Sequence, residues 1–210
     1  MNCKKIIQNG NTYVKFSLYY TVLKSKGDFT MDISKIKAKE VETIYGLKIG
    51  NPNAPVKVIE FINVSCPFCK KWHNDSKELL AKYVEEGKVQ RIIKHYDKET
   101  PHLRKGNVVH RYLDYSSPES ALREIEYFYD KQGEWGNLNN LDKIAAYVEE
   151  KRGLTVQSNE KQVAGIIEEA VRANVELVPS VFIGEEIFDE HITVDELQSL
   201  IENKLNSANK

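Results

Sequence analysis

Apolar and polar residues follow first a strand pattern, then a helix pattern and then a second strand pattern between residues 56 and 96. Residues 56–64 carry apolar side chains on both faces, which is typical of a central strand between helical layers. A 3.6-residue period follows and stops at Gly87, a residue type that commonly ends helices. Residues 89–96 again favour a strand. This succession predicts a βαβ unit with a right-handed crossover.

The next stretch, residues 101–174, shows helical periodicity. Ser117-Pro118 is predicted to begin one helix, because serine caps helices and proline suits the first helical position. Gly153 is predicted to end a second helix, and Asn174 to end a third in a left-handed conformation. The apolar stripes of these helices are predicted to pack a core.

Strand periodicity returns at residues 178–183 and 187–188, on either side of a turn at Gly184. Thr193 and Glu196 then have the spacing of a capping box, which predicts the start of a last helix. The order βαβ, helical block, ββα therefore indicates an α/β protein with helices inserted between its two groups of strands.

The composition fits one compact domain, or one domain with an insertion, in a chain of 210 residues. Hydrophobic residues make up 41% of the chain, which is enough to build a core. The 30 Lys and Arg against 31 Asp and Glu give a net charge of −1, which argues against a nucleic-acid-binding surface. No apolar run reaches the roughly 18 residues that a membrane helix needs. We therefore expect neither nucleic acid nor membrane as a partner.

Residues 1–44 are predicted to form an N-terminal arm. Residues 14–23 are the candidate for the apolar core of a signal peptide, but Lys15 interrupts them and no small-residue cleavage site follows. We therefore expect no signal peptide and a cytoplasmic protein. Residues 31–40 favour a helix, and Cys3 is interpreted as an incidental thiol.

Cys66-Pro-Phe-Cys69 lies where the first predicted strand gives way to a helix. Pro67 suits the first helical position, which places Cys66 at the helix N-terminus. Free backbone N–H groups and the positive end of the helix dipole favour a thiolate there. Cys69 lies about one turn further on, close enough to attack a mixed disulfide formed at Cys66. The spacing therefore supplies a nucleophile and a resolving thiol for disulfide exchange.

Two other interpretations of the cysteines remain open. Cys66, Cys69 and His73 could supply three ligands to zinc, although a structural site normally needs four ligands and the chain has no second C-x-x-C. The cysteine pair could also be purely structural. His73 is predicted to be a polar residue on the helix surface, and no metal site is expected.

Glu60 interrupts the otherwise apolar strand at residues 56–64. Burial disfavours the charged form of a carboxyl, so a desolvated Glu60 there would tend to have a raised pKa. It could then exchange a proton with Cys69 as the disulfide opens and closes. In the alternative interpretation, Glu60 lies near the open end of the strand and pairs with a lysine such as Lys57.

Taken together, these residues resemble the DsbA-like branch of the thioredoxin superfamily over about residues 45–205. The resemblance rests on residues 50–69, GNPNAPVKVIEFINVSCPFC, and on residues 174–184, NVELVPSVFIG. It implies a thioredoxin-like domain made of residues 45–100 and 175–210. An inserted α-helical domain at residues 101–174 would interrupt that fold.

The resemblance also implies roles for single residues. Cys66 matches the nucleophilic cysteine, and Cys69 matches the resolving one. Glu60 matches the buried acidic residue six positions before the first cysteine. Val178 and Pro179 match the cis-proline loop, which lies beside the cysteines and offers backbone hydrogen bonds to an extended substrate. No separate cofactor is implied, because the cysteine pair is itself the redox-active group.

The leading hypothesis is a DsbA-like thiol–disulfide oxidoreductase that acts on protein or small-molecule disulfides together with a redox partner protein. Phe68 stands where the strongly oxidising members of the family carry histidine, and phenylalanine cannot donate a hydrogen bond to the thiolate. The alternative is a non-catalytic or redox-sensing adaptor that binds a client protein through its thioredoxin-like surface. A glutathione-using transferase or isomerase is disfavoured, because such relatives usually do not need the second cysteine.

Overall fold

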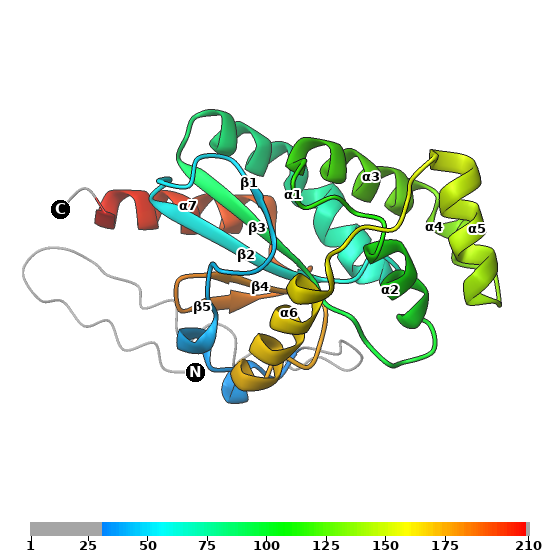
Figure 1. Cartoon of the computed structure of the whole chain (residues 1–210). Coiled ribbons are helices and arrows are strands. Elements are labelled where there is room, and N and C mark those ends of the chain that lie inside the picture. The colour runs from blue at the N-terminus through cyan, green and yellow to red at the C-terminus, as the bar shows by residue number, and fades with distance from the viewer. Residues whose placement is uncertain (1–30, 209–210) are drawn as a thin grey trace, which may run out of the picture. The chain divides into compact units, whose positions relative to one another are not determined.

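The computed structural model describes residues 31–208, and the residues from Asp32 onward belong to one compact unit. A five-stranded sheet with the order β1-β3-β2-β4-β5 forms its centre (Figure 1). The strands are β1 (Leu47–Ile49), β2 (Val56–Ile62), β3 (Val89–His95), β4 (Ser180–Ile183) and β5 (Glu186–Phe188). β2 and β3 are parallel, and the remaining neighbours in the sheet are antiparallel. The predicted α/β class is confirmed, and β1 is an additional edge strand.

Helices cover the sheet and fill the chain between β3 and β4 (Figure 1). They are α1 (Pro67–Glu85), α2 (Arg104–His110), α3 (Pro118–Asp130), α4 (Gln132–Trp135), α5 (Leu141–Arg152), α6 (Glu160–Ala173) and α7 (Val194–Ala208). The three helices predicted between residues 101 and 174 are α3, α5 and α6, whereas α2 and α4 were not predicted. Among residues 31–208, no helix combines the length and the apolar character that crossing a membrane requires.

Several predicted helix ends are confirmed. Gly153 and Asn174 both adopt left-handed conformations, with φ angles of 64° and 56°, directly after α5 and α6. Thr193 and Glu196 form the capping box at the start of α7, because the Thr193 backbone N–H donates to the Glu196 carboxylate at 2.9 Å. Ser117 precedes α3 as predicted, but its side chain makes no capping hydrogen bond.

The two faces of the sheet pack against different helices. Val58 and Ile62 of β2 belong to a large apolar cluster with residues of α1, α3, α5 and α7. Ile59 and Phe61 point to the other face and pack with residues of α6. Both faces of β2 are therefore buried, as its two-sided apolar pattern predicts.

The segment before β1 packs on α6 instead of forming the helix predicted at residues 31–40. It contains two short 3-10 turns, Ile33–Lys35 and Ala38–Glu40. Between them, the Lys37 N–H donates to the Ala173 carbonyl at 2.9 Å, so a backbone donor that a helix would use is bonded to α6. Cys3 and the rest of residues 1–30 of the predicted arm lie outside the described residues. The domain boundaries at residues 44, 100 and 174 stay predictions.

Candidate active site

Cys66 is the N-cap residue of α1, directly after the loop that follows β2. Pro67 occupies the first turn as predicted, and the Lys70 N–H donates to the Cys66 carbonyl at 3.1 Å. The pKa of Cys66 is lowered, chiefly by a hydrogen bond from the Cys69 thiol and further by the backbone N–H groups of Cys69 and Phe68. Burial and the nearby Glu190 oppose this effect. The start of α1 therefore stabilises a thiolate at Cys66.

Cys69 lies one turn further along α1 and has no exposed surface. Its sulfur accepts a hydrogen bond from the Asn63 backbone N–H, at an N···Sγ distance of 3.4 Å. The pKa of Cys69 is raised well above its ordinary value, first by burial and then by its interactions with the Cys66 sulfur. The two thiols thus shift in opposite directions: Cys66 toward thiolate, and Cys69 toward the protonated thiol.

The segment before β4 lies beside Cys66. The Val178–Pro179 peptide bond is cis, and the Cys66 thiol donates to the Val178 carbonyl at an Sγ···O distance of 3.4 Å. Leu177 and Phe68 are 51% and 57% exposed. The structure therefore brings the predicted substrate-binding residues to the predicted nucleophile. It also leaves one large apolar side chain of each segment open to solvent.

Glu60 is buried on β2, and its carboxylate is paired. Glu60 Oε1 accepts from Arg91 Nε at 2.8 Å, and Oε2 accepts from Arg91 Nη2 at 3.0 Å and from Trp72 Nε1 at 2.8 Å. The predicted burial of Glu60 is confirmed. The alternative pairing with Lys57 is wrong, because Lys57 donates to the Pro52 carbonyl and the Gln90 side chain. Among the described residues, no hydrogen bond joins Glu60 to Cys69.

Arg91 is a site residue that the sequence reasoning missed. It lies opposite Val58 in the parallel pairing of β2 and β3, so it shares a sheet face with Glu60. Burial works against the charge of Arg91, but the attraction and hydrogen bonds of Glu60 outweigh it and leave the pKa of Arg91 raised. A charged residue in the middle of the predicted strand 89–96 was the signal that could have pointed to this partner.

His73 is buried, and the prediction that it lies on the helix surface is wrong. It is 4% exposed and packs against Tyr129 of α3, with ring centroids 5.2 Å apart. Burial, together with the positive charges of Arg91 and Lys77, lowers the pKa of His73 to about 3. Its neutral ring is part of the contact between α1 and the helical block.

The zinc interpretation finds no converging set of ligands. In the part of the chain that the structure describes, one group of three side chains has its potential metal-binding atoms within 4.8 Å of one another: Asp189, Glu190 and His191. Cys66, Cys69 and His73 do not form such a group. His73 faces the core at Tyr129 instead of joining the sulfurs.

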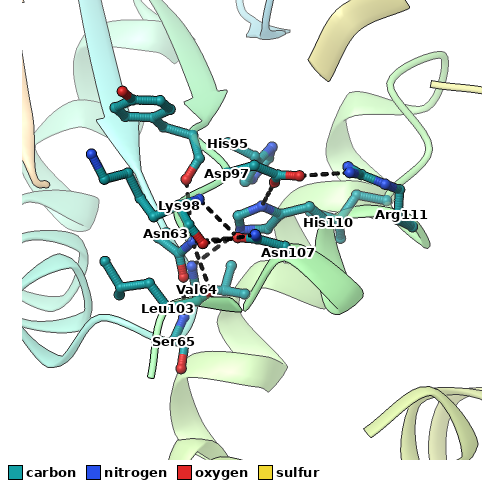
Figure 2. Close-up of polar contacts among 12 residues, drawn as sticks. Asn63, Val64, Ser65, His95, Asp97, Lys98, Leu103, Asn107, His110 and Arg111 are labelled. Atoms are coloured by element: carbon teal, nitrogen blue, oxygen red, sulfur yellow. Dashed lines mark hydrogen bonds and ion pairs between the residues drawn. The ribbon is translucent and has the colours of Figure 1, made fainter. Parts of the chain in front are cut away.

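The segment Asn63–Ser65, here called the pre-cysteine loop, is a second part of the site that the sequence did not reveal. Figure 2 shows it surrounded by polar side chains of the helical block and of the chain that leads into it. The Val64 N–H donates to His110 Nε2 at 3.3 Å, and the Val64 carbonyl accepts from Gln132 Nε2 at 2.9 Å. The loop that carries the chain into Cys66 is therefore held from the side of α2 and α4.

The fold is a thioredoxin-like sheet with a helical block inserted between β3 and β4. Two cysteines lie at the start of α1, beside a cis-proline. Together these features define the class of protein. Residues 42–203 match the family model described as thioredoxin. The chain therefore belongs to the thioredoxin family.

Solved structures agree with this assignment. A conserved protein of unknown function from Enterococcus faecalis V583 is 52% identical, with a TM-score of 0.80 over 82% of this chain and 98% of that chain. Oxidised BdbD from Bacillus subtilis is 15% identical, with a TM-score of 0.58 over 82% and 96% of the two chains. α-DsbA1 from Wolbachia pipientis is 17% identical, with a TM-score of 0.59 over 77% and 92%. The last two share the fold with this chain. No curated protein matches it.

Proposed function

We propose that this chain is a thiol–disulfide oxidoreductase that exchanges disulfides with protein or small-molecule thiols through Cys66 and Cys69. The observation that carries the proposal is the opposite environment of the two thiols. Cys66 has a lowered pKa and lies beside the Val178 carbonyl, whereas Cys69 is fully buried and has a raised pKa. Disulfide exchange needs this difference between the two thiols, because the attacking thiol must be ionised while the resolving thiol stays protonated until the mixed disulfide has formed.

In the reducing direction, the Cys66 thiolate attacks one sulfur of a substrate disulfide. The substrate S–S bond breaks, one substrate sulfur leaves as a thiolate, and the other forms a mixed disulfide with Cys66. Cys69 then loses its proton and attacks Cys66 Sγ, which releases the second substrate sulfur. Two electrons pass from the cysteine pair to the substrate, and the proton of Cys69 ends on a released thiolate. The reverse sequence oxidises a dithiol.

Val178 and Pro179 are proposed to hold the substrate beside Cys66. A mixed disulfide at Cys66 displaces the thiol hydrogen bond to the Val178 carbonyl, which leaves this oxygen free to accept from a substrate backbone N–H. The exposed side chains of Phe68 and Leu177 can cover apolar substrate residues on either side. An extended, partly apolar peptide segment suits this surface.

A cytoplasmic location and a redox partner protein are also part of the proposal. Cytoplasmic glutathione and thioredoxin keep thiols reduced, so the net flow of electrons would run from the cysteine pair to the substrate. Phe68 supports this direction, because it offers no side-chain donor to the Cys66 thiolate. A less stabilised reduced form makes the pair a weaker oxidant. A proton relay through Glu60 stays a prediction. In this structure both oxygens of Glu60 already accept hydrogen bonds, from Arg91 and Trp72.

Insulin reduction by dithiothreitol tests the proposal in the full chain. The Cys3→Ser variant is the matched control and should keep the wild-type rate. Cys66→Ser should fall to the uncatalysed rate, because it lacks the nucleophile. Cys69→Ala should accumulate a mixed disulfide between Cys66 and an insulin chain, detectable by mass spectrometry without reductant. Equal rates for the wild type and Cys66→Ser would overturn the proposal in favour of an adaptor that only binds a client.

A further inference from the structure

The backbone N–H of Asn63 is the single main-chain donor that reaches the Cys69 sulfur in the described structure. This hydrogen bond favours negative charge on a thiol that burial otherwise keeps protonated. Its geometry depends on where the pre-cysteine loop places Asn63. The contacts that fix this loop therefore act on Cys69 without touching it.

The Asn63 side chain is anchored to the beginning of the helical block. Its Nδ2 lies 3.2 Å from each of three acceptors: the Tyr96 carbonyl, the Leu103 carbonyl and Asn107 Oδ1 (Figure 2). Its Oδ1 accepts from the Ser65 N–H at 3.0 Å, which closes the loop on itself. Asn63 has no exposed surface, so its position is set by the protein groups around it.

Asn107 is in turn fixed to the backbone of the β3–α2 connection. Its Oδ1 also accepts from the Lys98 N–H at 3.1 Å, and its Nδ2 donates to the Lys98 carbonyl at 2.9 Å. One side chain of α2 therefore joins the Asn63 amide to the chain that leaves the sheet. The position of Asn63 is set by residues that lie more than thirty positions away in the sequence.

Gly106 of α2 makes the close approach possible. A Cβ atom at this position would lie 2.0 Å from Asn63 Oδ1 and 3.0 Å from the Ser65 backbone nitrogen. No side chain can occupy that space unless the pre-cysteine loop moves. By contrast, a Cβ atom at Gly133 of α4 would meet nothing within 4 Å.

His110 holds the middle of the loop. Its Nε2 accepts from the Val64 N–H, so the ring proton lies on Nδ1, which donates to Asp97 Oδ1 at 2.8 Å (Figure 2). Arg111 binds the other oxygen of Asp97 at 2.6 Å. Asp97 therefore fixes the ring orientation in which His110 can accept from the loop backbone.

We infer that α2 and the chain leading into it position the pre-cysteine loop so that the Asn63 N–H activates Cys69 as the resolving thiol. Asn63 is a positioning residue, and Gly106 and Asn107 act through it. This inference rests on the proposed function, because resolution matters only if Cys66 forms mixed disulfides. The hydrogen bond from the Asn63 N–H stabilises the Cys69 thiolate that attacks Cys66 Sγ. The proton of the Cys69 thiol goes to solvent or to the leaving substrate thiolate.

The test separates the two steps of exchange with dithiobis(nitrobenzoate) as the probe disulfide. Reduced protein carrying Cys3→Ser releases one thionitrobenzoate when Cys66 attacks and a second when Cys69 resolves the mixed disulfide. Gly106→Ala and Asn107→Leu should slow the second release about tenfold, because a hydrogen bond to a developing thiolate is lost or weakened. The first release should stay within about twofold of the parent rate, and Gly133→Ala should leave both releases unchanged.

The pH profile of the second release supplies the readout that a purely structural role would not move. Its midpoint should rise in Gly106→Ala and Asn107→Leu, while the midpoint of the first release stays in place. Second-release rates and midpoints equal to those of the parent in both variants would overturn the inference. A parallel slowing of both releases in both variants would overturn it too, because it indicates general damage to the site.

The two proposals fail in different ways. If the parent protein releases no second thionitrobenzoate, the redox pair itself is refuted, and with it the basis of the inference. If the parent releases two and the variants match it, only the role of Asn63 is refuted. Asn107 is half-buried and its replacement adds no Cβ atom against Asn63, so Asn107→Leu keeps the test decisive where Gly106→Ala does not fold.

Discussion

The buried ion pair between Glu60 and Arg91 gives the sharpest stability prediction. Both side chains are almost completely withdrawn from water, at 1% and 4% exposure. Replacing Arg91 by Met removes both of its hydrogen bonds and leaves the Glu60 carboxylate with Trp72 Nε1 as its remaining partner among the described residues. Breaking one side of a buried pair costs about 3–5 kcal/mol, because the other charge stays buried without compensation.

This cost is large against the roughly 5–15 kcal/mol of total stability that is usual for a folded protein. We therefore expect Arg91→Met to lower the urea midpoint strongly with an unchanged m-value, measured by far-ultraviolet circular dichroism near neutral pH. Glu60→Gln should cost a similar amount, since it leaves the Arg91 guanidinium buried and unpaired. The double variant should recover most of the loss, because it buries no charge and the introduced amide oxygen can still accept from Trp72.

Lys131, whose exposed side chain pairs with Glu134, supplies the control, because replacing it should leave the urea midpoint unchanged. A loss below about 1 kcal/mol for Arg91→Met would refute the reasoning, since only a solvated pair is worth so little. Additive losses in the double variant would refute it as well. Glu60→Gln also decides the proton-relay prediction, which requires slower release of the second thionitrobenzoate with an altered pH profile.

Two further predictions concern titration. Alkylation of Cys66 by iodoacetamide, followed against pH in the Cys3→Ser background, should have its midpoint below that of an ordinary thiol, at about 8.5. Cys69→Ala should raise this midpoint more than Cys69→Ser, because serine keeps a hydroxyl donor and the hydrogen bond from Cys69 is the main cause of the lowered Cys66 pKa. Equal midpoints in the two variants would contradict that cause. His73 has a folded-state pKa of about 3 against an ordinary value of 6.5, so only the unfolded chain binds its proton between these values. The free energy of unfolding therefore decreases as the pH falls through this window, by about 1.4 kcal/mol per pH unit for this group. His73→Phe should reduce the slope of the unfolding free energy against pH by the equivalent of one proton. An unchanged slope would contradict a neutral, buried His73.

Local patterns were enough to predict most of the fold. The long periodic segments became β2, α1, β3, α3, α5, α6 and α7, and the residues Gly153, Asn174 and Thr193 end or begin helices as their types suggest. The strand β1 escaped prediction because it has three residues, and it is not joined by a tight turn to a longer strand as the equally short β5 is at Gly184. Helix α2 escaped because it has seven residues with Gly106 among them, and glycine weakens a helix signal.

The candidate site likewise combines features that neighbouring residues predict with contacts between residues far apart in the sequence. The position of Cys66 at a helix N-terminus follows from Pro67 and the preceding strand, all within a few residues of the chain. The partner of Glu60 is 31 positions away, and the partners of the Asn63 amide are 33 to 44 positions away. No local pattern encodes such contacts. The alternation of β3 could have placed Arg91 on the face of Glu60, but only once the register of two strands was known.

The helical block supplies hydrogen-bond partners to the loop that leads into Cys66. A loop between a strand and a helix leaves backbone groups without partners, and buried groups of this kind are costly unless another element bonds them. In this chain His110, Gln132 and Asn107 supply those partners, directly to Val64 or through Asn63. The inserted helices are thus part of the support of the cysteine pair, because the same contacts that satisfy the loop also aim the Asn63 N–H at Cys69. A change in α2 is therefore expected to alter the chemistry of the second thiol. The first thiol should keep its lowered pKa, because Cys69 stays protonated and still donates a hydrogen bond to it.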